Sequence, residues 1–532
     1  MSSGGNFVNR KKLASWLPLF TALLLLLSAC SSPLSLPGSD GNQAALNEAA
    51  AGGKRNGDVT LKLVLPGETP PRYNEVMKAL NEKLSASIHA ALDIEYIPWS
   101  SYNNQLLVKM AAGEDYDFFY NGYWQNYSQI LNRMGARDVT DLIERYAPDL
   151  YKGLTPEYIH TNKYNGKLYG IPIPGPIEYP QGFNFRADIA EKYGYNASNL
   201  GSLQQVEAFL KKALASERAS GRVGIRYNGE YTGDYKAMAF LGTQREYVPS
   251  YDFNSPGFLL NNEPVVINQF ETQQYKDFLK LKRRWWDEGL IDKDSLFSKA
   301  SLQSELISDT KSLGYISNAP EGYMGENSAG RAKLDPGARL DYVSIEGEGF
   351  KMVSSFKAGN FIVITPSSRN AERVLMFLNV LYKDKEIRDL YLYGIQGKDF
   401  VPVGDKQFKY PEGADPSKVF QNLWWMVTPW SNARIPASAT ATDKKFIQMS
   451  TDPNNFTKSV IAGFDFNPDP VKTEISKVNT IVVEYRKTLE SGSGTDAQQD
   501  AKYNEFIDKL KKAGVDKIIA EKQKQIDAFL KK

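Results

Sequence analysis

The sequence predicts an α/β protein of two lobes with a cleft between them and a helical C-terminal region. Strand-like and helix-like segments alternate from Val59 onward, a proline-rich stretch interrupts them, and a second alternating region follows before a helical tail. The 532 residues are 42% hydrophobic and 24% charged, enough for a large core in two or three domains. This composition excludes a disordered chain, a collagen-like chain and a coiled coil.

Residues 10–30 predict an export signal with a lipid anchor. Three basic residues precede an apolar run, residues 13–27, that contains Pro18 and is shorter than the roughly 20 residues that span a bilayer. The run ends in Leu-Ser-Ala-Cys, which resembles the lipobox of bacterial lipoproteins, and Cys30 is the single cysteine of the chain. We expect acylation of Cys30 after removal of residues 1–29. An ordinary signal peptide with an incidental cysteine is the alternative.

The exported chain is nearly neutral, with 61 basic and 62 acidic residues left after signal removal. No basic field exists to hold a nucleic acid. One cysteine excludes an intrachain disulfide, and two histidines, His89 and His160, exclude a His/Cys zinc site. Residues 30–58 are rich in small and polar residues and predict a flexible tether. We expect no metal and no cofactor.

The first lobe is predicted to contain a mostly parallel sheet with helices on both faces. Its expected strands are residues 59–65, 92–97 and 116–120, and its expected helices are residues 73–84 and 102–112. Ligands of such sheets bind beyond the carboxyl ends of the strands. This rule places Trp99, Asn121, Tyr123 and Trp124 at the functional rim.

Residues 168–176 contain three prolines within five residues and predict an extended crossover between lobes. Helical patterns resume at residues 187–193 and 203–214, and a buried strand, 360–365, precedes a helix, 371–381. We therefore assign residues 59–170 plus about 359–415 to the first lobe. The second lobe takes residues 171–358 plus about 416–532.

The C-terminal part is predicted to consist of helices docked on a lobe. Apolar residues recur there in alternating steps of four and three, at Val471, Ile475, Val478, Val482, Tyr485 and Leu489. Residues 491–494 break the pattern. Two amphipathic stretches, 503–510 and 515–530, follow on either side of Gly514.

The sequence contains no phosphate-binding loop, no dinucleotide fingerprint, no zinc-protease motif and no serine-hydrolase elbow. His89 and His160 read as ordinary histidines. A glycosidase needs only two carboxylates, and Asp115 with Asp117 is the natural pair. A structural role at the start of a strand explains these two residues equally well.

Aromatic residues make up 12% of the chain and suit sugars, whose C–H faces stack on rings while neighbouring polar groups bond their hydroxyls. Helical spacing favours a core role for Trp285 and Trp286, and Tyr391 and Tyr393 also read as structural. For Trp124, and for the irregular segment with Trp424 and Trp430, ligand contact and packing stay equally open. Tyr179 and Asn184 lie near the crossover and Tyr231 in a polar segment. The expected ligand-binding residues are Trp99, Asn121, Tyr123, Trp124, Tyr179, Asn184, Tyr231, Trp424 and Trp430.

Several motifs together resemble the family 1 extracellular solute-binding proteins of sugar ABC transporters, especially the large lipoproteins of paenibacillus-type Gram-positive bacteria. The shared motifs are the lipobox, the crossover Gly-Lys-Leu-Tyr-Gly-Ile-Pro-Ile (166–173), Phe-Asn-Phe-Arg (183–186), Ala-Glu-Lys-Tyr-Gly (190–194), Pro-Ser-Ser-Arg-Asn-Ala-Glu-Arg (366–373), Tyr-Gly-Ile-Gln-Gly (393–397), Gly-Phe-Asp-Phe-Asn-Pro-Asp-Pro (463–470) and Leu-Lys-Lys-Ala-Gly (510–514).

The resemblance implies a periplasmic-binding-protein-like fold, with a hinge between the lobes, and no catalysis. It implies capture of a carbohydrate, an oligosaccharide in particular, and its delivery to an ABC transporter permease. It also implies a monomer, lipid-anchored on the extracytoplasmic face of the cell membrane. Two alternatives stay open: a secreted carbohydrate-active enzyme, either hydrolase or lyase, and a binder of a non-sugar solute such as a peptide.

Overall fold

The chain divides into two units, Met1–Gly57 and Asp58–Lys532, of which the second is described. The computed structural model describes residues 58–531 except 227–237, 249–254, 298–308, 318–321, 423–425, 427 and 430–431. Cys30, Tyr231, Trp424 and Trp430 therefore lie outside the described residues. No helix among the described residues is both long enough and apolar enough to cross a membrane.

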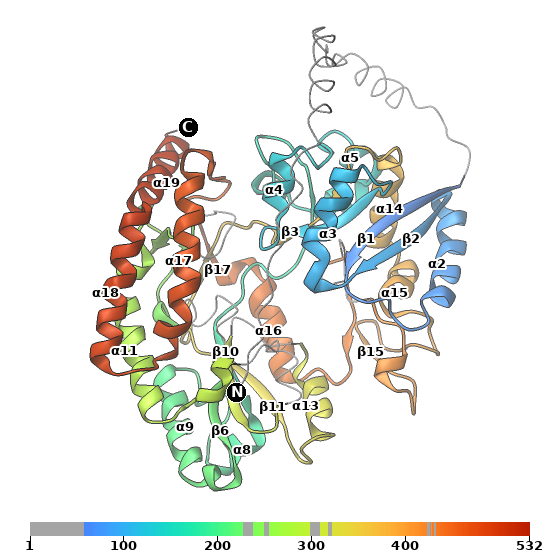
Figure 1. The fold of residues 1–532 in the computed structure, drawn as a ribbon. Coiled ribbons are helices and arrows are strands. Elements are labelled where there is room, and N and C mark those ends of the chain that lie inside the picture. The colour runs from blue at the N-terminus through green and yellow to red at the C-terminus, as the bar shows by residue number, and fades with distance from the viewer. Residues whose placement is uncertain are drawn as a thin grey trace, which may run out of the picture. The chain divides into compact units, whose positions relative to one another are not determined.

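The first sheet has five strands in the order β2-β1-β3-β13-β4 (Figure 1). Strand β1 pairs in parallel with β2 and with β3, as predicted. Strand β13 pairs antiparallel with both β3 and β4, so the sheet is mixed at the side where the chain returns from the second sheet. The strands are β1 Val59–Pro66, β2 Ala90–Ile97, β3 Phe118–Gly122, β4 Ile171–Pro172 and β13 Asn360–Ile364.

Helices cover both faces of this sheet, because alternate residues of its strands enter two different cores. Leu63 and Phe118 pack with apolar residues of α2 and α14, whereas Val64 and Phe119 pack with those of α3 and α4. Figure 1 shows α14 beside β1 although the two are distant in sequence. The helices of this part are α2 Tyr73–Ile88, α3 Trp99–Ala112, α4 Tyr127–Asn132, α5 Ile143–Tyr146, α6 Pro148–Gly153, α7 Pro156–Thr161, α14 Ala371–Lys383 and α15 Lys385–Tyr393.

The second sheet also has five strands, in the order β11-β5-β10-β6-β9. Strand β5 pairs antiparallel with β10 and β11, and β6 pairs in parallel with β10 and β9. Its strands are β5 Gly182–Arg186, β6 Val223–Arg226, β9 Ile291–Asp292, β10 Ser312–Ser317 and β11 Leu340–Ser344. The helices nearby in sequence are α8 Ala187–Lys192, α9 Leu203–Glu217, α11 Gln273–Asp287 and α13 Met324–Ala332.

Short strands accompany the connections between the two large sheets. The chain passes from the first sheet to the second along residues 173–181, returns along residues 345–359, and passes again between β15 and α16. The short strands are β7 Arg245–Tyr247, β8 Phe258–Leu260, β12 Met352–Ser354, β14 Val401–Val403, β15 Gln407–Lys409, β16 Ile435–Pro436 and β17 Phe456–Lys458. The short 3-10 helices are Arg218–Ser220, Gln269–Glu271, Lys293–Phe297, Pro416–Lys418, Pro453–Asn455 and Asp469–Val471.

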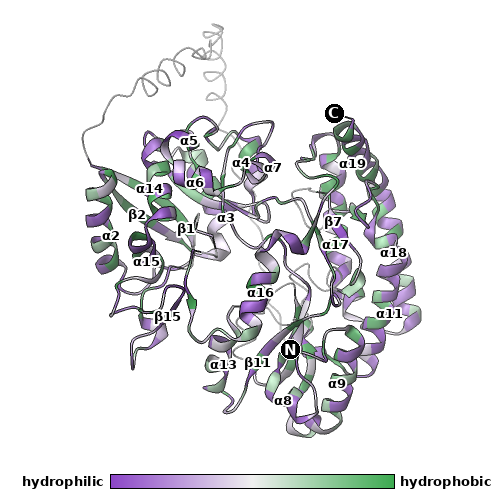
Figure 2. Ribbon diagram, turned by 180° about the vertical axis from the view of Figure 1, so that it is seen from behind, coloured by the Kyte–Doolittle hydropathy of each residue, from purple (hydrophilic) through white to green (hydrophobic). Residues whose placement is uncertain are grey.

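The C-terminal residues form helices that share a core with the second sheet, as predicted. Val478, Val482 and Leu489 of the expected apolar stripe are fully buried there. Gly514 separates the last two helices with a φ of 97°, which a residue with a side chain adopts only at a cost. Figure 2 shows hydrophilic and hydrophobic residues alternating around α18 and α11. The helices are α16 Ala441–Thr451, α17 Lys472–Ser491, α18 Asp496–Ala513 and α19 Val515–Leu530.

Candidate functional site

Two exposed tryptophans lie together beyond the carboxyl ends of β2 and β3. Trp99 opens α3 directly after β2, and Trp124 follows β3 in a turn. Their ring centroids are 5.7 Å apart with 34° between the planes. Trp99 is 49% exposed and Trp124 is 42% exposed. We call this pair the tryptophan platform. It lies where the rule for ligands of parallel sheets predicts a site.

Hydrogen bonds to Asn360 hold the Trp124 side of the platform in place. The indole Nε1 of Trp124 donates to Oδ1 of Asn360 over 2.7 Å, and the hydroxyl of Tyr120 donates to the same oxygen over 2.5 Å. Asn360 lies opposite Gly122 in the antiparallel pairing of β13 with β3. A Cβ atom on Gly122 would lie 2.7 Å from Trp124 Nε1, so the indole needs glycine at this position.

Tyr123 lies behind the platform, half-buried among other aromatic rings. It makes edge contacts with Tyr127 and Phe361, each at a centroid distance of 5.3 Å. Its backbone N–H donates to the carbonyl of Gly359 over 3.2 Å. The ammonium of Lys357 lies 5.7 Å from its ring centroid. Tyr123 is therefore placed near the predicted rim, but packing holds its ring.

Asn121 and Asn184, both predicted to bind ligand, lie inside the protein. Strand β3 extends to Gly122, two residues beyond the predicted end, so Asn121 is within the strand and has no exposed area. Its amide donates to Asn126 over 2.7 Å and its oxygen accepts from the Gly122 N–H. Asn184 is also fully buried, in the middle of β5, and donates to Ser317 over 2.9 Å. Neither side chain can contact a ligand in this conformation, so these two predictions are corrected.

The crossover adds Tyr179 and Glu178, two accessible polar side chains. Tyr179 is 40% exposed and stacks on Phe446 at a centroid distance of 6.1 Å. Desolvation raises the pKa of the Tyr120 hydroxyl, and the nearby phenol of Tyr179 raises it further. Tyr179 therefore lies near Tyr120, at the base of the platform. Solvent reaches Glu178, yet the surrounding protein desolvates its carboxylate, and the charge of Glu246 adds to this effect. Together they raise the pKa of Glu178 to about 8.

Other aromatic predictions concerned the core, and the structure confirms them. Trp285 and Tyr391 are fully or almost fully buried, and Tyr393 is 7% exposed. Trp286 packs against the same core as Trp285 and is partly buried. The buried rings of Trp285, Tyr391 and Tyr393 therefore do not belong to an open binding surface.

The carboxylates considered for glycoside hydrolysis lie at the opposite end of β3 from the platform. Asp117 is 5% exposed and accepts hydrogen bonds from Ser368 over 2.6 Å and from Asn370 over 3.1 Å. Asp115 is exposed and pairs with Lys62 at 2.7 Å. Both residues have structural partners. Among the residues that the structure describes, no three metal-ligating side chains cluster.

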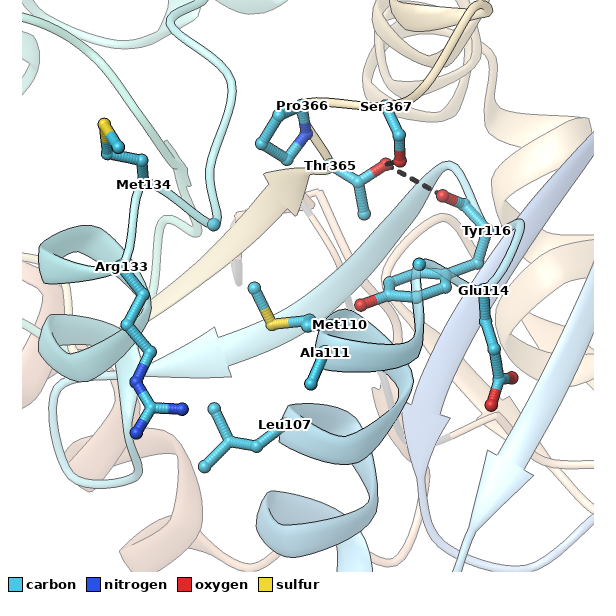
Figure 3. A pocket seen from close by; sticks show the side chains of 12 residues that line it. Leu107, Met110, Ala111, Glu114, Tyr116, Arg133, Met134, Thr365, Pro366 and Ser367 are labelled. Carbon is cyan, nitrogen blue, oxygen red and sulfur yellow. Dashed lines mark hydrogen bonds between the residues drawn. The ribbon is translucent and has the colours of Figure 1, made fainter. Parts of the chain in front are cut away.

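A pocket of about 360 Å³ also opens at this opposite edge (Figure 3). Side chains of α3, of the segment before β3, of the turn after α4 and of the turn after β13 line it, including Met110, Arg133 and Pro366. Figure 3 shows the hydroxyl of Thr365 bonded to the backbone carbonyl of Tyr116. Strand β3 separates this pocket from the tryptophan platform.

Two known proteins are similar to this chain over most of its length. A carbohydrate ABC transporter substrate-binding protein of Streptococcus pneumoniae is 27% identical over 483 residues, which are 88% of this chain and 91% of the relative. The polygalacturonan/rhamnogalacturonan-binding protein of Bacillus subtilis is 24% identical over 76% of this chain and 78% of its own. The chain is similar over most of its length to substrate-binding proteins of carbohydrate ABC transporters. This extracellular solute-binding protein is a binder and not an enzyme.

A solved structure supports the fold of this solute-binding protein. The N-glycan transport solute binding protein of S. pneumoniae has a TM-score of 0.72 and 24% identity, covering 89% of this chain and 99% of its own. The same pneumococcal protein has also been solved with Man1GlcNAc and with Man5GlcNAc. Residues 460–531 match a domain of unknown function, DUF3502.

Some residues of the site were not predicted from the sequence. Tyr120, Gly122 and Asn360 support the platform, and Glu178 adds an accessible carboxylate. Asn360 begins a predicted strand. The edge of the sheet at which Asn360 lies depends on whether that strand runs parallel or antiparallel to its neighbours, and the local sequence does not indicate this direction.

Proposed function

We propose that this solute-binding protein captures an oligosaccharide on the tryptophan platform and delivers it to the permease of an ABC transporter. The observation that carries the proposal is the pair of exposed, adjacent indoles, Trp99 and Trp124, at the carboxyl edge of the first sheet. Adjacent aromatic faces bind the C–H faces of a sugar ring well. Large apolar groups held open to solvent by hydrogen bonds beneath them also indicate a binding surface.

Polar groups near the platform suit sugar hydroxyls. Tyr179 can both donate and accept a hydrogen bond, and Glu178 can accept bonds as a carboxylate or donate one as a protonated acid. The relatives support a carbohydrate ligand, since one is named for N-glycan transport and another for polygalacturonan and rhamnogalacturonan. These names differ in the sugar, so the ligand class proposed here is oligosaccharide without a fixed monosaccharide.

We also propose a division of the chain into two lobes that close on the ligand. The proposal takes residues 59–170 with about 359–415 as one lobe and residues 171–358 with about 416–532 as the other. The buried clusters support this division in outline, since those around the first sheet draw on residues 61–171 and 358–426, and those around the second sheet draw on residues 183–345 and 446–526. Lobes joined by extended connections close by hinge motion. Ligand contacts from Tyr231, Trp424 and Trp430 stay predictions, and so does a lipid anchor at Cys30.

A thermal-shift screen tests the ligand class. The exported chain is mixed with neutral N-glycan oligosaccharides, galacturonan oligosaccharides and a peptide library. A ligand present at a hundredfold its dissociation constant adds about 2.7 kcal/mol to the free energy of unfolding. We expect a shift with at least one oligosaccharide and no cleavage of it. A shift with peptides alone, or release of sugar fragments, would overturn the proposal.

A further inference from the structure

Asn360 occupies a junction between the tryptophan platform and both connections. It begins β13, directly after the return connection of residues 345–359. Its backbone carbonyl accepts a hydrogen bond from the N–H of Ile173, at the start of the outgoing crossover, over 3.0 Å. Its side-chain oxygen accepts from Trp124 and from Tyr120. One residue therefore contacts the outgoing connection, the return connection and the platform.

The chemistry of the two donors determines how the amide of Asn360 is oriented. An indole N–H only donates, and a carbonyl-type oxygen has two lone pairs, which Trp124 and Tyr120 occupy. The reverse orientation would direct the amide NH₂ at the indole N–H, where no hydrogen bond can form. The Oδ1 atom of Asn360 is therefore the acceptor that the Trp124 indole requires.

We propose that Asn360 is a positioning residue that holds the Trp124 indole beside Trp99 and thereby sets the affinity for an oligosaccharide. This inference rests on the proposed function. An indole that is 42% exposed has few packing contacts to select one rotamer, so a hydrogen bond to its N–H carries much of that selection. Binding to a side chain that is already oriented costs less entropy than binding to a free one.

The same geometry ties the platform to the hinge region. Asn360 is joined by its peptide bond to the return connection and by its carbonyl to the outgoing connection. A change in either connection as the lobes close therefore acts on the residue that orients Trp124.

Two variants separate the acceptor oxygen from the rest of the side chain. Asn360→Ala removes the acceptor, and Asn360→Asp keeps an oxygen for both donors. In ¹⁵N-labelled protein without ligand, the indole N–H signal of Trp124 is identified by its absence in Trp124→Phe. We expect this signal to move and its hydrogen exchange to accelerate in Asn360→Ala, and to return toward its original behaviour in Asn360→Asp. An unchanged signal in Asn360→Ala would overturn the inference.

Affinity measurements use Man5GlcNAc and galacturonan oligosaccharides as probes. Asn360→Ala should weaken binding by roughly three- to tenfold, the range expected for one neutral hydrogen bond, and Asn360→Asp should recover most of it. In a Trp124→Phe background, which keeps an aromatic face but has no indole N–H, Asn360→Ala should have no further effect, because its action passes through that N–H. An equal loss in both backgrounds would overturn the inference.

Asn81→Ala is the control, because the side chain of Asn81 likewise makes two hydrogen bonds, here to the backbone of Leu92, but lies away from the platform. It should leave the indole signal and the affinity unchanged. Failure of the proposed function has a different pattern: wild-type protein binds neither probe, or Trp124→Ala keeps full affinity. In that case, the indole N–H signal of Trp124 in Asn360→Ala alone tests whether Asn360 positions the Trp124 side chain.

Discussion

Lys357 donates a hydrogen bond to the carboxylate of Asp465. The ammonium of Lys357 also donates to the carbonyl of Phe464 over 2.8 Å and lies against the ring of Tyr123. Lys357 belongs to the return connection, and Asp465 belongs to the C-terminal region that matches DUF3502. The ion pair therefore joins this region to the return connection, beside Tyr123.

Lys357→Met should lower the free energy of unfolding by about 2 kcal/mol, because it leaves a largely buried Asp465 without its cation. Urea unfolding at pH 7 measures the change. Lys62→Met is the control, since the pair of Lys62 with Asp115 is exposed to solvent and should contribute much less to stability. Equal effects of the two substitutions would contradict the prediction.

Gly122→Ala should weaken oligosaccharide binding about tenfold or more. The new Cβ would lie 2.6 Å from the carbonyl of Gly359 and 2.7 Å from Nε1 of Trp124, so the indole must move. Gly359→Ala is the control, because nothing lies within 4 Å of its added Cβ. Calorimetric titration with the oligosaccharide found in the screen compares the two. Normal affinity in Gly122→Ala would show that the indole position is unimportant.

Trp124→Ala should abolish most binding while changing stability by less than about 1 kcal/mol, because the side chain is substantially exposed. Trp285→Ala should do the reverse. It empties a fully buried site and removes a 2.8 Å hydrogen bond to Glu207, at a cost of about 3–5 kcal/mol. Melting and affinity are measured on both variants. Strong destabilisation by Trp124→Ala, with normal affinity of the folded fraction, would assign Trp124 to packing.

Glu178→Gln should flatten the fall in stability between about pH 5 and pH 8. Desolvation and the charge of Glu246 raise the pKa of Glu178 to about 8, and desolvation raises the pKa of Glu246 to about 7, while Arg245 and Lys357 favour the charged forms. The folded protein thus keeps protons in this range that the unfolded chain has lost, so wild-type stability declines as pH rises. Melting temperatures at pH 5.5, 7 and 8.5 test this against Glu82→Gln, an exposed control on α2. Parallel curves for all three proteins would refute it.

Cys30→Ala should release the protein from the membrane or leave it unprocessed, since the thiol is the atom that a lipobox acylates. Fractionation of cells, with mass measurement of the mature N-terminus, provides the readout. Ser28→Thr, a mild change within the same motif, serves as the comparison. Normal processing and full membrane retention of Cys30→Ala would favour an ordinary signal peptide.

The sequence alone predicted those features that depend on local periodicity. Alternation of apolar residues placed β1 and β2, and steps of three and four placed the helix that contains Val478 and Val482. Trp99 and Trp124 were predicted near strand ends because a strand and a helix can be recognised from neighbouring residues. Burial of Trp285 followed from its spacing on a helix.

Other features depend on pairing between distant segments, for which the chain carries no local signal. Asn121 was misplaced because β3 continues for two more residues, held by its pairing with β13. Asn360 meets Trp124 across 236 residues of sequence, and only the antiparallel direction of β13 brings it to the platform edge. Short-range sterics and hydrophobic periodicity were thus sufficient to predict the main strands and helices of the first sheet, the C-terminal helices and the turn that carries Trp124. The polar side chains that support the platform emerged from the folded chain alone, because strand register and direction are set by the packing of the whole sheet.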